Sequence, residues 1–473
     1  MLQRQESRLP LSDHPAARRT SPESARPPRP ALGGVISLLA LVLGAPLIPS
    51  LLPLTARAQL VDSATGTSLD GSPALPPQRP VAPAPSLQLP PQPAALGTPL
   101  LGEQVVCPTL QQRLLATLAG EASLWSVSVA DPRGRLLADV NGLRPRVPAS
   151  NQKLLSTAFA LDRLGPDFRL NTQLWRLSDG TLRLTGQGDP DLALPQLQRF
   201  ARLVASDSNG QPVRLQLAEL PAQAWWPQGW AYGDRSAAYG APVTRLAITS
   251  NVIEEAVMNP PARLRSLIGR ALEQQGARAQ VSLVDAAMPL PADAQLVHQE
   301  PSTTMHGLLS LANTESHNFT AEVLLRSAAG TWDLVEATRL ETDWLRRQDL
   351  PMQGVRIADG SGLDRSNRLT SRFLTALLLR MDQHPYGRDY LSSMAIAGQR
   401  GTLRNLFKGS SLDGRLFAKT GTLTGVRAIS GVLQTSDGPR YVSAISNGAG
   451  APNQTIGSIL RQVQDVSLCA GGL

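Results

Sequence analysis

Apolar positions recur with regular spacing only in the part of the chain that begins near residue 106. Leucines fall on one face of a predicted helix at 109–118. Residues 124–129 alternate between apolar and polar side chains, and 135–140 return after a turn, which predicts a β-hairpin. Helical spacing follows at 150–164, directly after Pro148. The folded part therefore opens with a helix, a hairpin and a second helix.

The same pattern closes the chain. Helices are predicted at 304–312, 319–327, 374–381 and about 456–466, and strands at 415–419, 426–435 and 440–446. A hairpin, several helices, three consecutive strands and a final helix indicate an antiparallel sheet covered by helices. The predicted fold class is α+β, with a main body formed by 106–167 and 298–473.

Residues 168–297 have a different character. Short strand-like pieces such as 181–185 alternate with Gly/Pro/Asp turns, and helical spacing is found at 263–275. This pattern predicts an inserted, mainly-β accessory region. Trp225, Trp226 and Trp230 are expected to form its core and rim rather than a ligand platform.

The N-terminal residues follow the order of an export signal. An arginine-rich stretch precedes an apolar run at 31–54, and small residues follow it up to Ala58. This order predicts a secretory signal peptide at 1–58, cleaved after Ala58. Three prolines interrupt the apolar run, and this disfavours a stable helix that spans a membrane. Cleavage is therefore favoured, and a retained membrane anchor is the alternative. The protein is expected in the periplasm or cell envelope.

A linker is predicted at 59–105, because ten prolines fall between Pro73 and Pro99 among small and polar residues. The formal net charge of +8 is shared equally between 1–58 and the remainder. The remainder holds no Lys/Arg cluster interleaved with aromatic residues, so no nucleic acid partner is expected. Association with a membrane surface stays open.

Two cysteines, Cys107 and Cys469, lie near the two ends of the folded part. In an exported protein they are expected to form a disulfide, and the alternative is a pair of buried thiols. The five histidines lack the spacing of metal ligands. No metal and no cofactor are expected.

Lysine is rare enough to be informative. Only Lys153, Lys408 and Lys419 occur beside 42 arginines. Arginine stays protonated in proteins and cannot act as a base, whereas burial and nearby charge can lower the pKa of a lysine. Two of the three lysines lie in short motifs, which indicates a chemical role for their amines.

The first motif joins Ser150 and Lys153. Residues three apart share a helix face, so the amine would lie beside the hydroxyl. A serine hydroxyl is a weak nucleophile until a base takes its proton, and Lys153 is such a base only when it is neutral. It must therefore be buried, near another cation, or both.

The second motif is Lys419-Thr420-Gly421, in a strand predicted at 417–423. Alternation puts residues 419 and 421 on one face, and the glycine leaves room beside the lysine for an extended substrate. Lys419 and Thr420 could hold a carboxylate. The alternative is a glycine bulge in an edge strand.

The third motif, Ser316-His317-Asn318, lies between two predicted helices. Ser316 and Asn318 could both point into a cleft, where the serine could pass a proton. The alternative is a polar loop with a helix cap. His317 is expected to face solvent.

In the order S-x-x-K, S-x-N, K-T-G, these motifs resemble the class C low-molecular-mass penicillin-binding proteins, the D-alanyl-D-alanine carboxypeptidase/endopeptidase family. The resemblance covers 106–473. It implies a β-lactamase/transpeptidase-like antiparallel sheet flanked by helices. Four further stretches resemble the family: 188–190, 239–243, 359–363 and 401–404.

The resemblance implies that Ser150 attacks the carbonyl of a terminal D-Ala-D-Ala peptide and that Lys153 accepts its proton. Ser316 would relay that proton to the departing D-alanine. Water would then release the acyl-enzyme. The implied partners are peptidoglycan peptides ending in D-Ala-D-Ala, with β-lactams as inhibitors that acylate Ser150.

Substrate binding is implied for the remaining motif residues. Asn318 would position the peptide. Lys419 and Thr420 would bind the terminal carboxylate beside Gly421, and the N–H groups of Ser150 and Thr422 would form the oxyanion hole.

Two other functions are weighed against this one. A β-lactamase of the same fold would need a general base for rapid deacylation, and no Glu-x-x-x-Asn helix supplies one. A non-catalytic envelope binding protein would not need Ser150, Lys153 and Lys419 intact. Ser361 is a rival nucleophile, but its Asp-Gly-Ser-Gly setting is more simply a tight turn.

Overall fold

The computed structural model describes residues 101–208 and 210–469. The predicted signal peptide at 1–58 and residues 59–100 of the predicted linker lie outside the described residues. Within the described part, no helix combines the length and apolar character needed to cross a membrane.

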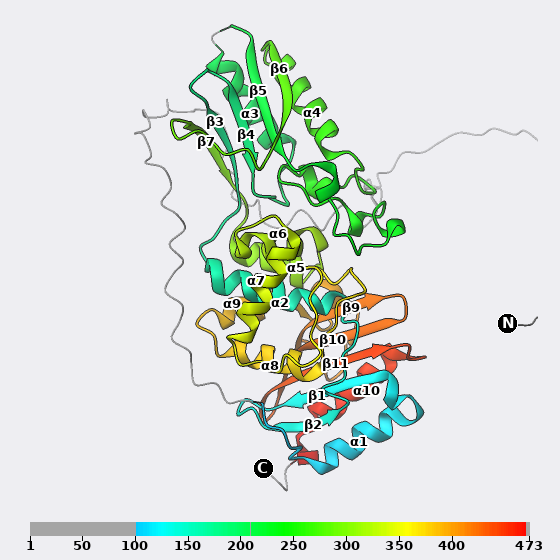
Figure 1. Ribbon diagram of the computed structural model, residues 1–473. Helices are drawn as coiled ribbons and strands as arrows, with labels where there is room; N and C mark the ends of the chain where they lie inside the picture. Colours follow the sequence, from blue (N-terminus) through cyan, green and yellow to red (C-terminus); the bar gives the residue numbers. More distant parts are fainter. Residues whose placement is uncertain (1–100, 209, 470–473) are drawn as a thin grey trace, which may run out of the picture. The chain divides into compact units, whose positions relative to one another are not determined.

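A six-stranded antiparallel sheet forms the main body (Figure 1), in the order β2-β1-β11-β10-β9-β8. Its strands are β1 (Trp125–Ala130), β2 (Leu136–Val140), β8 (Ala395–Ile396), β9 (Leu416–Leu423), β10 (Val426–Thr435) and β11 (Gly438–Asn447). The predicted hairpin and the three consecutive C-terminal strands thus join one sheet. Because β8 is only two residues long, β9 is unpaired on one side over the stretch that carries the K-T-G motif.

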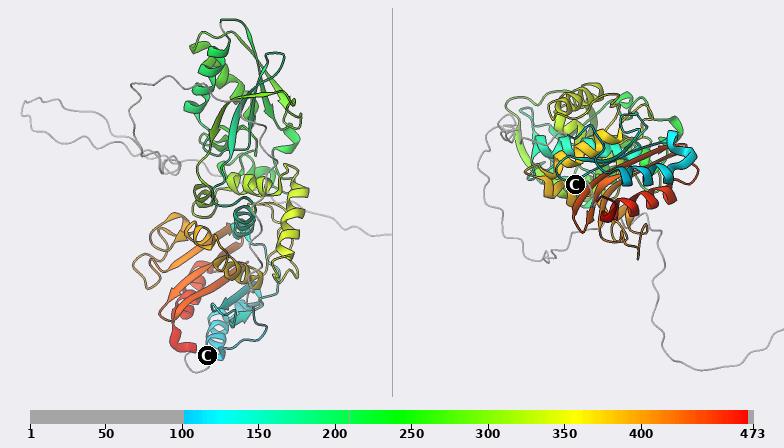
Figure 2. Two further views of the ribbon diagram at one scale, coloured as in Figure 1. Left: turned by 90° about the vertical axis from the view of Figure 1, so that its left-hand side faces the viewer. Right: turned by 90° about the horizontal axis from the view of Figure 1, so that it is seen from below.

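Helices cover both faces of this sheet. On one face, α1 (Pro108–Leu118) and α10 (Pro452–Gln464) lie side by side (Figures 1 and 2) and bury their leucines and isoleucines against alternate residues of β1, β10 and β11. The other face packs against the larger helical layer. That layer consists of α2 (Lys153–Leu164), α5 (Met305–Asn313), α6 (Asn318–Ala329), α7 (Leu334–Arg346), α8 (Ser371–Asp382) and α9 (Gly387–Ser392). The predicted antiparallel sheet flanked by helices is confirmed.

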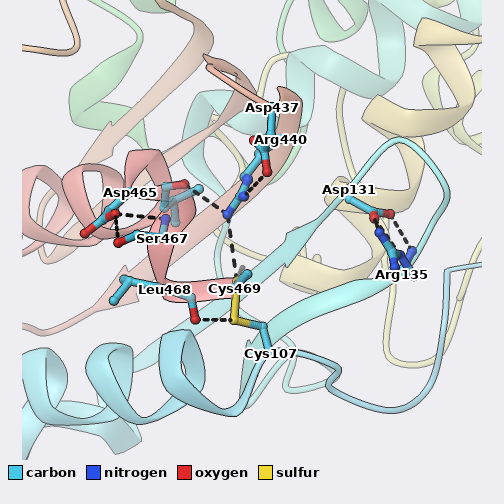
Figure 3. Close-up of a disulfide and its surroundings, with 10 residues drawn as sticks. Cys107, Asp131, Arg135, Asp437, Arg440, Asp465, Ser467, Leu468 and Cys469 are labelled. Atoms are coloured by element: carbon cyan, nitrogen blue, oxygen red, sulfur yellow. Dashed lines mark hydrogen bonds and ion pairs between the residues drawn. A yellow bond between two sulfur atoms is a disulfide. The ribbon is translucent and has the colours of Figure 1, made fainter. Parts of the chain in front are cut away.

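Cys107 and Cys469 form a disulfide between the residue preceding α1 and the end of the described chain (Figure 3). Their Cα atoms are 5.4 Å apart, and both side chains are buried. Arg440 of β11 lies beside the bridge and donates to Asp437 at 2.8 Å. The disulfide closes a loop with a sequence separation of 362 residues.

Residues 171–301 form a second, five-stranded mixed sheet in the order β6-β5-β4-β3-β7. Its strands are β3 (Asn171–Arg176), β4 (Leu182–Gly186), β5 (Val213–Glu219), β6 (Ala279–Asp285) and β7 (Gln295–Pro301). The last strand runs across the boundary predicted at 297. Helices α3 (Leu194–Asp207) and α4 (Pro260–Gln274) pack on this sheet. The inserted region is therefore more helical than predicted, because α3 escaped detection.

The segment between β5 and α4 is mostly irregular and contains four short 3₁₀ turns. The sequence pattern placed Trp230 in the core or rim of the inserted region, but this residue does not belong to the core of the second sheet. It packs into the core of the main body and donates from Nε1 to Asp359 at 2.9 Å. Thr249, Ser250 and Asn251 adopt left-handed backbone conformations, with φ between 51° and 58°. The buried Asn251 side chain donates to the Pro242 carbonyl at 2.9 Å and to the hydroxyl of Thr244. These hydrogen bonds help to hold the left-handed segment in place.

Candidate active site

The first motif lies in a tight turn that leads into a helix. A 3₁₀ turn (Ala149–Gln152) continues directly into α2, which ends at Gly165. Ala149 has a φ of 48°, a left-handed conformation that costs energy for a residue with a Cβ. Strained backbone of this kind persists where the surrounding structure fixes it, and here it presents the half-buried Ser150 at the start of the helix.

Lys153 is fully buried, and three oxygens surround its Nζ. Nζ lies 2.9 Å from Ser150 Oγ, 2.6 Å from Asn318 Oδ1 and 2.7 Å from the Ser361 carbonyl oxygen. Asn318 Oδ1 and the carbonyl can only accept hydrogen bonds. A neutral amine has two N–H groups and one lone pair. It can satisfy both acceptors and still direct its lone pair at the Ser150 hydroxyl.

Burial lowers the pKa of Lys153 to about 7, although Asp359 and Glu322 act in the opposite direction. A substantial fraction of the amine is therefore neutral near pH 7. This satisfies the condition that the sequence could only state: the base must exist in its unprotonated form.

A second serine–lysine pair lies across the site. Lys419 Nζ donates to Ser316 Oγ at 2.8 Å and to the Thr420 carbonyl at 2.9 Å. Ser316, with φ of 63°, is held in a left-handed turn just before α6. Burial, followed by the charge of Lys153, lowers the pKa of Lys419 well below its ordinary value. Ser316 contacts Lys419, whereas the hydroxyl beside Lys153 is that of Ser150.

Asn318, the first residue of α6, uses both ends of its amide. Oδ1 accepts from Lys153, and Nδ2 donates to the Tyr239 carbonyl at 2.8 Å. Tyr239 belongs to the inserted region, in one of the stretches that resemble the family. The insertion thereby fixes the orientation of the amide that holds the lysine.

A cavity of about 320 Å³ opens between the two serine–lysine pairs. It is lined by Ser150, Ser316, Thr402, Leu406, Phe407, Thr420, Gly421, Thr422, Arg427, Ala428, Ile429, Asn453 and Ile456. The structure thus brings together the residues of all three motifs. Asn318, Lys153 and Lys419 are buried next to this cavity and do not line it. Thr402, whose hydroxyl contacts that of Thr420 at 2.8 Å, and Arg427 were not singled out from the sequence. Thr402 lies in a stretch that resembles the family, whereas Arg427 gave no sequence signal.

Gly421 lets β9 lie close to the 3₁₀ turn at Ala149–Gln152 that carries Ser150, called the nucleophile turn from here on. A Cβ at this position would lie 2.7 Å from the Pro148 carbonyl oxygen and 2.9 Å from Asn151 Nδ2. Asn151 in turn donates to the Lys419 carbonyl at 3.1 Å. The glycine is required by this close approach, in addition to the open face inferred from the strand pattern.

Ser361 and His317 both lie near Lys153 without lining the cavity. Ser361 is buried, its hydroxyl faces Asp359 at 3.2 Å, and only its backbone carbonyl reaches Lys153. The expectation that His317 faces solvent is wrong, because its ring is partly buried and contacts Thr320 Oγ1 at 2.7 Å. Burial, and then the charge of Lys153, lowers the pKa of His317 to about 4.

Comparison with known proteins gives a family match over most of the described chain. The model of the D-Ala-D-Ala carboxypeptidase 3 (S13) family matches residues 110–263 and 253–463. A D-alanyl-D-alanine carboxypeptidase of Actinomadura sp. (strain R39) is 26% identical over 435 residues, covering 72% of this chain and 80% of the relative. Carboxypeptidase Rv3627c of Mycobacterium tuberculosis is 29% identical over 390 residues, covering 74% and 84%.

Solved structures show the same fold. The crystal structure of penicillin binding protein 4 (dacB) from Haemophilus influenzae matches with a TM-score of 0.64 at 18% identity, covering 76% of this chain and 99% of that one. A second structure of that protein, complexed with a β-lactam, matches with a TM-score of 0.59 at 20% identity, covering 77% and 99%.

Proposed function

The chain belongs to the D-Ala-D-Ala carboxypeptidase 3 (S13) family, and we propose that Ser150, Lys153, Ser316 and Lys419 carry out its reaction. The protein is a serine-type D-Ala-D-Ala carboxypeptidase/endopeptidase and a penicillin-binding protein. The observation that carries the proposal is the environment of Lys153. Its amine is buried against two acceptors that leave the lone pair for the Ser150 hydroxyl.

Acylation begins with the attack of Ser150 Oγ on the carbonyl carbon of the penultimate D-alanine. As the C–O bond forms, the hydroxyl proton passes to the lone pair of Lys153 Nζ. The negative charge that develops on the carbonyl oxygen is stabilised by the N–H groups of Ser150 and Thr422, two residues that line the cavity.

The leaving D-alanine needs a proton on its nitrogen as the C–N bond breaks. Ser316 supplies it from its hydroxyl and receives in exchange the proton that Lys153 accepted from Ser150, so that Lys153 and Ser316 both return to their starting states. The Ser316 hydroxyl is held for this relay by a 2.8 Å hydrogen bond from Lys419. Lys419 and Thr420 hold the terminal carboxylate beside Gly421. Asn318 does not line the cavity, so it positions the peptide indirectly, through its contact with Lys153. Water then attacks the Ser150 ester and releases the shortened peptide.

The substrates that fit this chemistry are peptidoglycan stem peptides ending in D-Ala-D-Ala. The family acts on the cell wall, outside the cytoplasm, and we place this protein in the periplasm or cell envelope. Residues 106–167 and 298–473 form the catalytic domain, 168–297 an accessory insertion, and 59–105 a linker after a signal peptide at 1–58. A β-lactam, whose strained amide resembles the substrate, acylates Ser150.

Intact-mass measurement after incubation with benzylpenicillin tests this proposal. The unmodified chain gains the mass of one penicillin, and Ser150→Ala gains none. Ser361→Ala is the matched control, because it removes a motif hydroxyl that faces Asp359 and keeps the carbonyl on Lys153. A penicillin adduct on Ser150→Ala would contradict the assignment. Rapid turnover of a chromogenic cephalosporin would favour a β-lactamase instead.

A further inference from the structure

The Asp-Gly-Ser-Gly-Leu loop at 359–363 has no role in the steps above, yet it contacts the catalytic base. The Ser361 carbonyl is one of the two acceptors that bind the N–H groups of Lys153. Without it, one N–H of a fully buried amine would lack a partner, and the lone pair would no longer be directed at Ser150. The position of this backbone carbonyl therefore determines where the lone pair points.

Glycines let the loop approach so closely. A Cβ on Gly360 would lie 2.9 Å from the Ala321 carbonyl oxygen of α6, and one on Gly362 would lie 1.9 Å from the Ala149 carbonyl oxygen. Gly362 also has a φ of +84°, a backbone conformation that residues with a Cβ rarely adopt. The loop is inserted between α6 and the nucleophile turn, in contact with both.

One carboxylate holds the loop from below. Glu322 Oε1 accepts the backbone N–H groups of both Gly360 and Ser361, each at 2.9 Å. Its other oxygen, Oε2, pairs with Arg326 at 2.7 Å. Glu322 is fully buried and Arg326 is 3% exposed. Because Glu322 follows Asn318 by one helical turn on α6, the same helix carries the side-chain acceptor of Lys153 and the anchor of its backbone acceptor.

We propose that Glu322, with Arg326 as its counter-ion, is a positioning residue that holds the Ser361 carbonyl against Lys153 and so directs the base at Ser150. The inference deepens the proposed function and rests on it. Glu322 touches neither the cavity nor the nucleophile, so its effect on the reaction passes entirely through the loop and its field at the lysine.

Titratable groups surround Lys153 on several neighbouring elements. Asp359 comes from the loop, Glu322 from α6 and Lys419 from β9, while His317 precedes α6. The two carboxylates raise the pKa of Lys153 and partly oppose its burial. Burial, and then Glu322 and Asp359, raise the pKa of Glu341 of α7 well above its ordinary value.

Two double variants separate the hydrogen bonds of Glu322 from its charge. In Glu322→Gln/Arg326→Gln, an amide oxygen can still accept both loop N–H groups, and the two amides can pair. In Glu322→Met/Arg326→Met, the loop loses its acceptor, while an apolar pair of similar volume replaces the buried ion pair. Glu336→Gln/Arg339→Gln, an exposed ion pair on α7, removes the same two charges as a control.

The readout is acylation by benzylpenicillin, resolved into initial binding and the first-order step, together with thermal unfolding. The Met pair should slow the first-order step about 10- to 100-fold with initial binding unchanged, because the lysine is misdirected. The Gln pair should stay within about threefold of the unmodified chain because its hydrogen bonds remain. Its acidic limb should move to lower pH, since the Glu322 carboxylate, one of the two groups that raise the pKa of Lys153, is gone. The control should change neither.

A Met pair that is acylated as fast as the unmodified chain overturns the inference, and so does a Gln pair that is slowed as much as the Met pair. Should the Met pair fail to fold, the first-order step of the Gln pair decides: a rate within about threefold of the unmodified chain supports the inference, because the loop hydrogen bonds remain, and a loss of more than about tenfold overturns it. The proposed function fails separately, if the unmodified chain is not acylated at Ser150 at all.

Discussion

At the scale of single residues, the chemistry depends on two buried amines. Lys153 and Lys419 are both fully buried, and each lies within 3 Å of a serine hydroxyl. Burial without a carboxylate partner is costly for an ammonium and lowers the pKa of each lysine. Arginine could not act as a base at position 153, which explains why lysine persists there in a chain that otherwise uses arginine.

Acylation should depend on pH through Lys153. Because its pKa is lowered to about 7, the neutral form needed to accept the proton disappears as the pH falls below that value. The acylation rate with benzylpenicillin should therefore decrease about tenfold for each pH unit below about 7 and level off above it. Stopped-flow or quenched mass measurements across this range check the limb. A rate that stays flat down to about pH 5 would contradict a lysine base.

Lys153→Arg should abolish acylation while keeping the positive charge. The guanidinium cannot release its proton at neutral pH, so the loss should be on the order of 10³-fold or more. Lys408→Arg is the matched control, because Lys408 is exposed and lies outside the site. Intact mass after exposure to benzylpenicillin distinguishes the two variants. Efficient labelling of Lys153→Arg would exclude Lys153 as the base.

At the scale of elements, the site is formed where three segments meet. The nucleophile turn and α2 supply Ser150 and Lys153, and the start of α6 supplies Asn318. Lys419 comes from the part of β9 that is paired with β10 on one side only. Asn151 connects the turn to the strand through its hydrogen bond to the Lys419 carbonyl. The distance between the strand and the turn therefore sets the width of the cleft.

Gly421→Ala should widen that junction. The added methyl would lie 2.7 Å from the Pro148 carbonyl oxygen, so the strand or the turn must move by several tenths of an ångström. Acylation should fall about 10- to 100-fold, because the oxyanion donors on the turn and the strand separate. Gly269→Ala on α4, where a Cβ meets open space, serves as the control. Unchanged acylation kinetics in Gly421→Ala would show that the junction tolerates the displacement.

At the scale of the whole described molecule, long-range contacts tie together segments that are remote in sequence. The disulfide joins Cys107 to Cys469, and β1 pairs with β11, so both ends of the folded chain belong to one sheet layer. The inserted region contributes the Tyr239 carbonyl to Asn318 and the Trp230 indole to Asp359. The insertion is thus connected to the groups that orient Lys153.

Removing the disulfide should lower stability without removing activity. A loop of this length constrains the unfolded chain strongly, so Cys107→Ser/Cys469→Ser should lose about 2 to 5 kcal/mol of unfolding free energy. Acylation should persist at low denaturant, because neither cysteine lines the cavity. Denaturant unfolding with and without a reductant measures the difference. An unchanged unfolding midpoint would show that the bridge adds no net stability.

The sequence alone was sufficient wherever the signal is local. Helix and strand periodicity gave most elements of the main body, although α7, α9 and β8 were not predicted, and the spacing within each motif gave its chemistry. It failed where burial depends on partners far along the chain. The partly buried His317 was expected in solvent for this reason. The helix α3 was missed although Leu197, Phe200, Ala201 and Val204 recur with helical spacing, which is a local signal.

What only the tertiary structure decided is the protonation state on which the reaction depends. No local pattern states that the Ser361 carbonyl, 208 residues away, completes the shell of Lys153, or that the Tyr239 carbonyl fixes Asn318. A pKa is set by desolvation and by charges within a few ångströms, and these are properties of the packed chain. The sequence determined which groups could react, and the fold determined that burial lowers the pKa of one amine to about 7 and that this amine is directed at its serine.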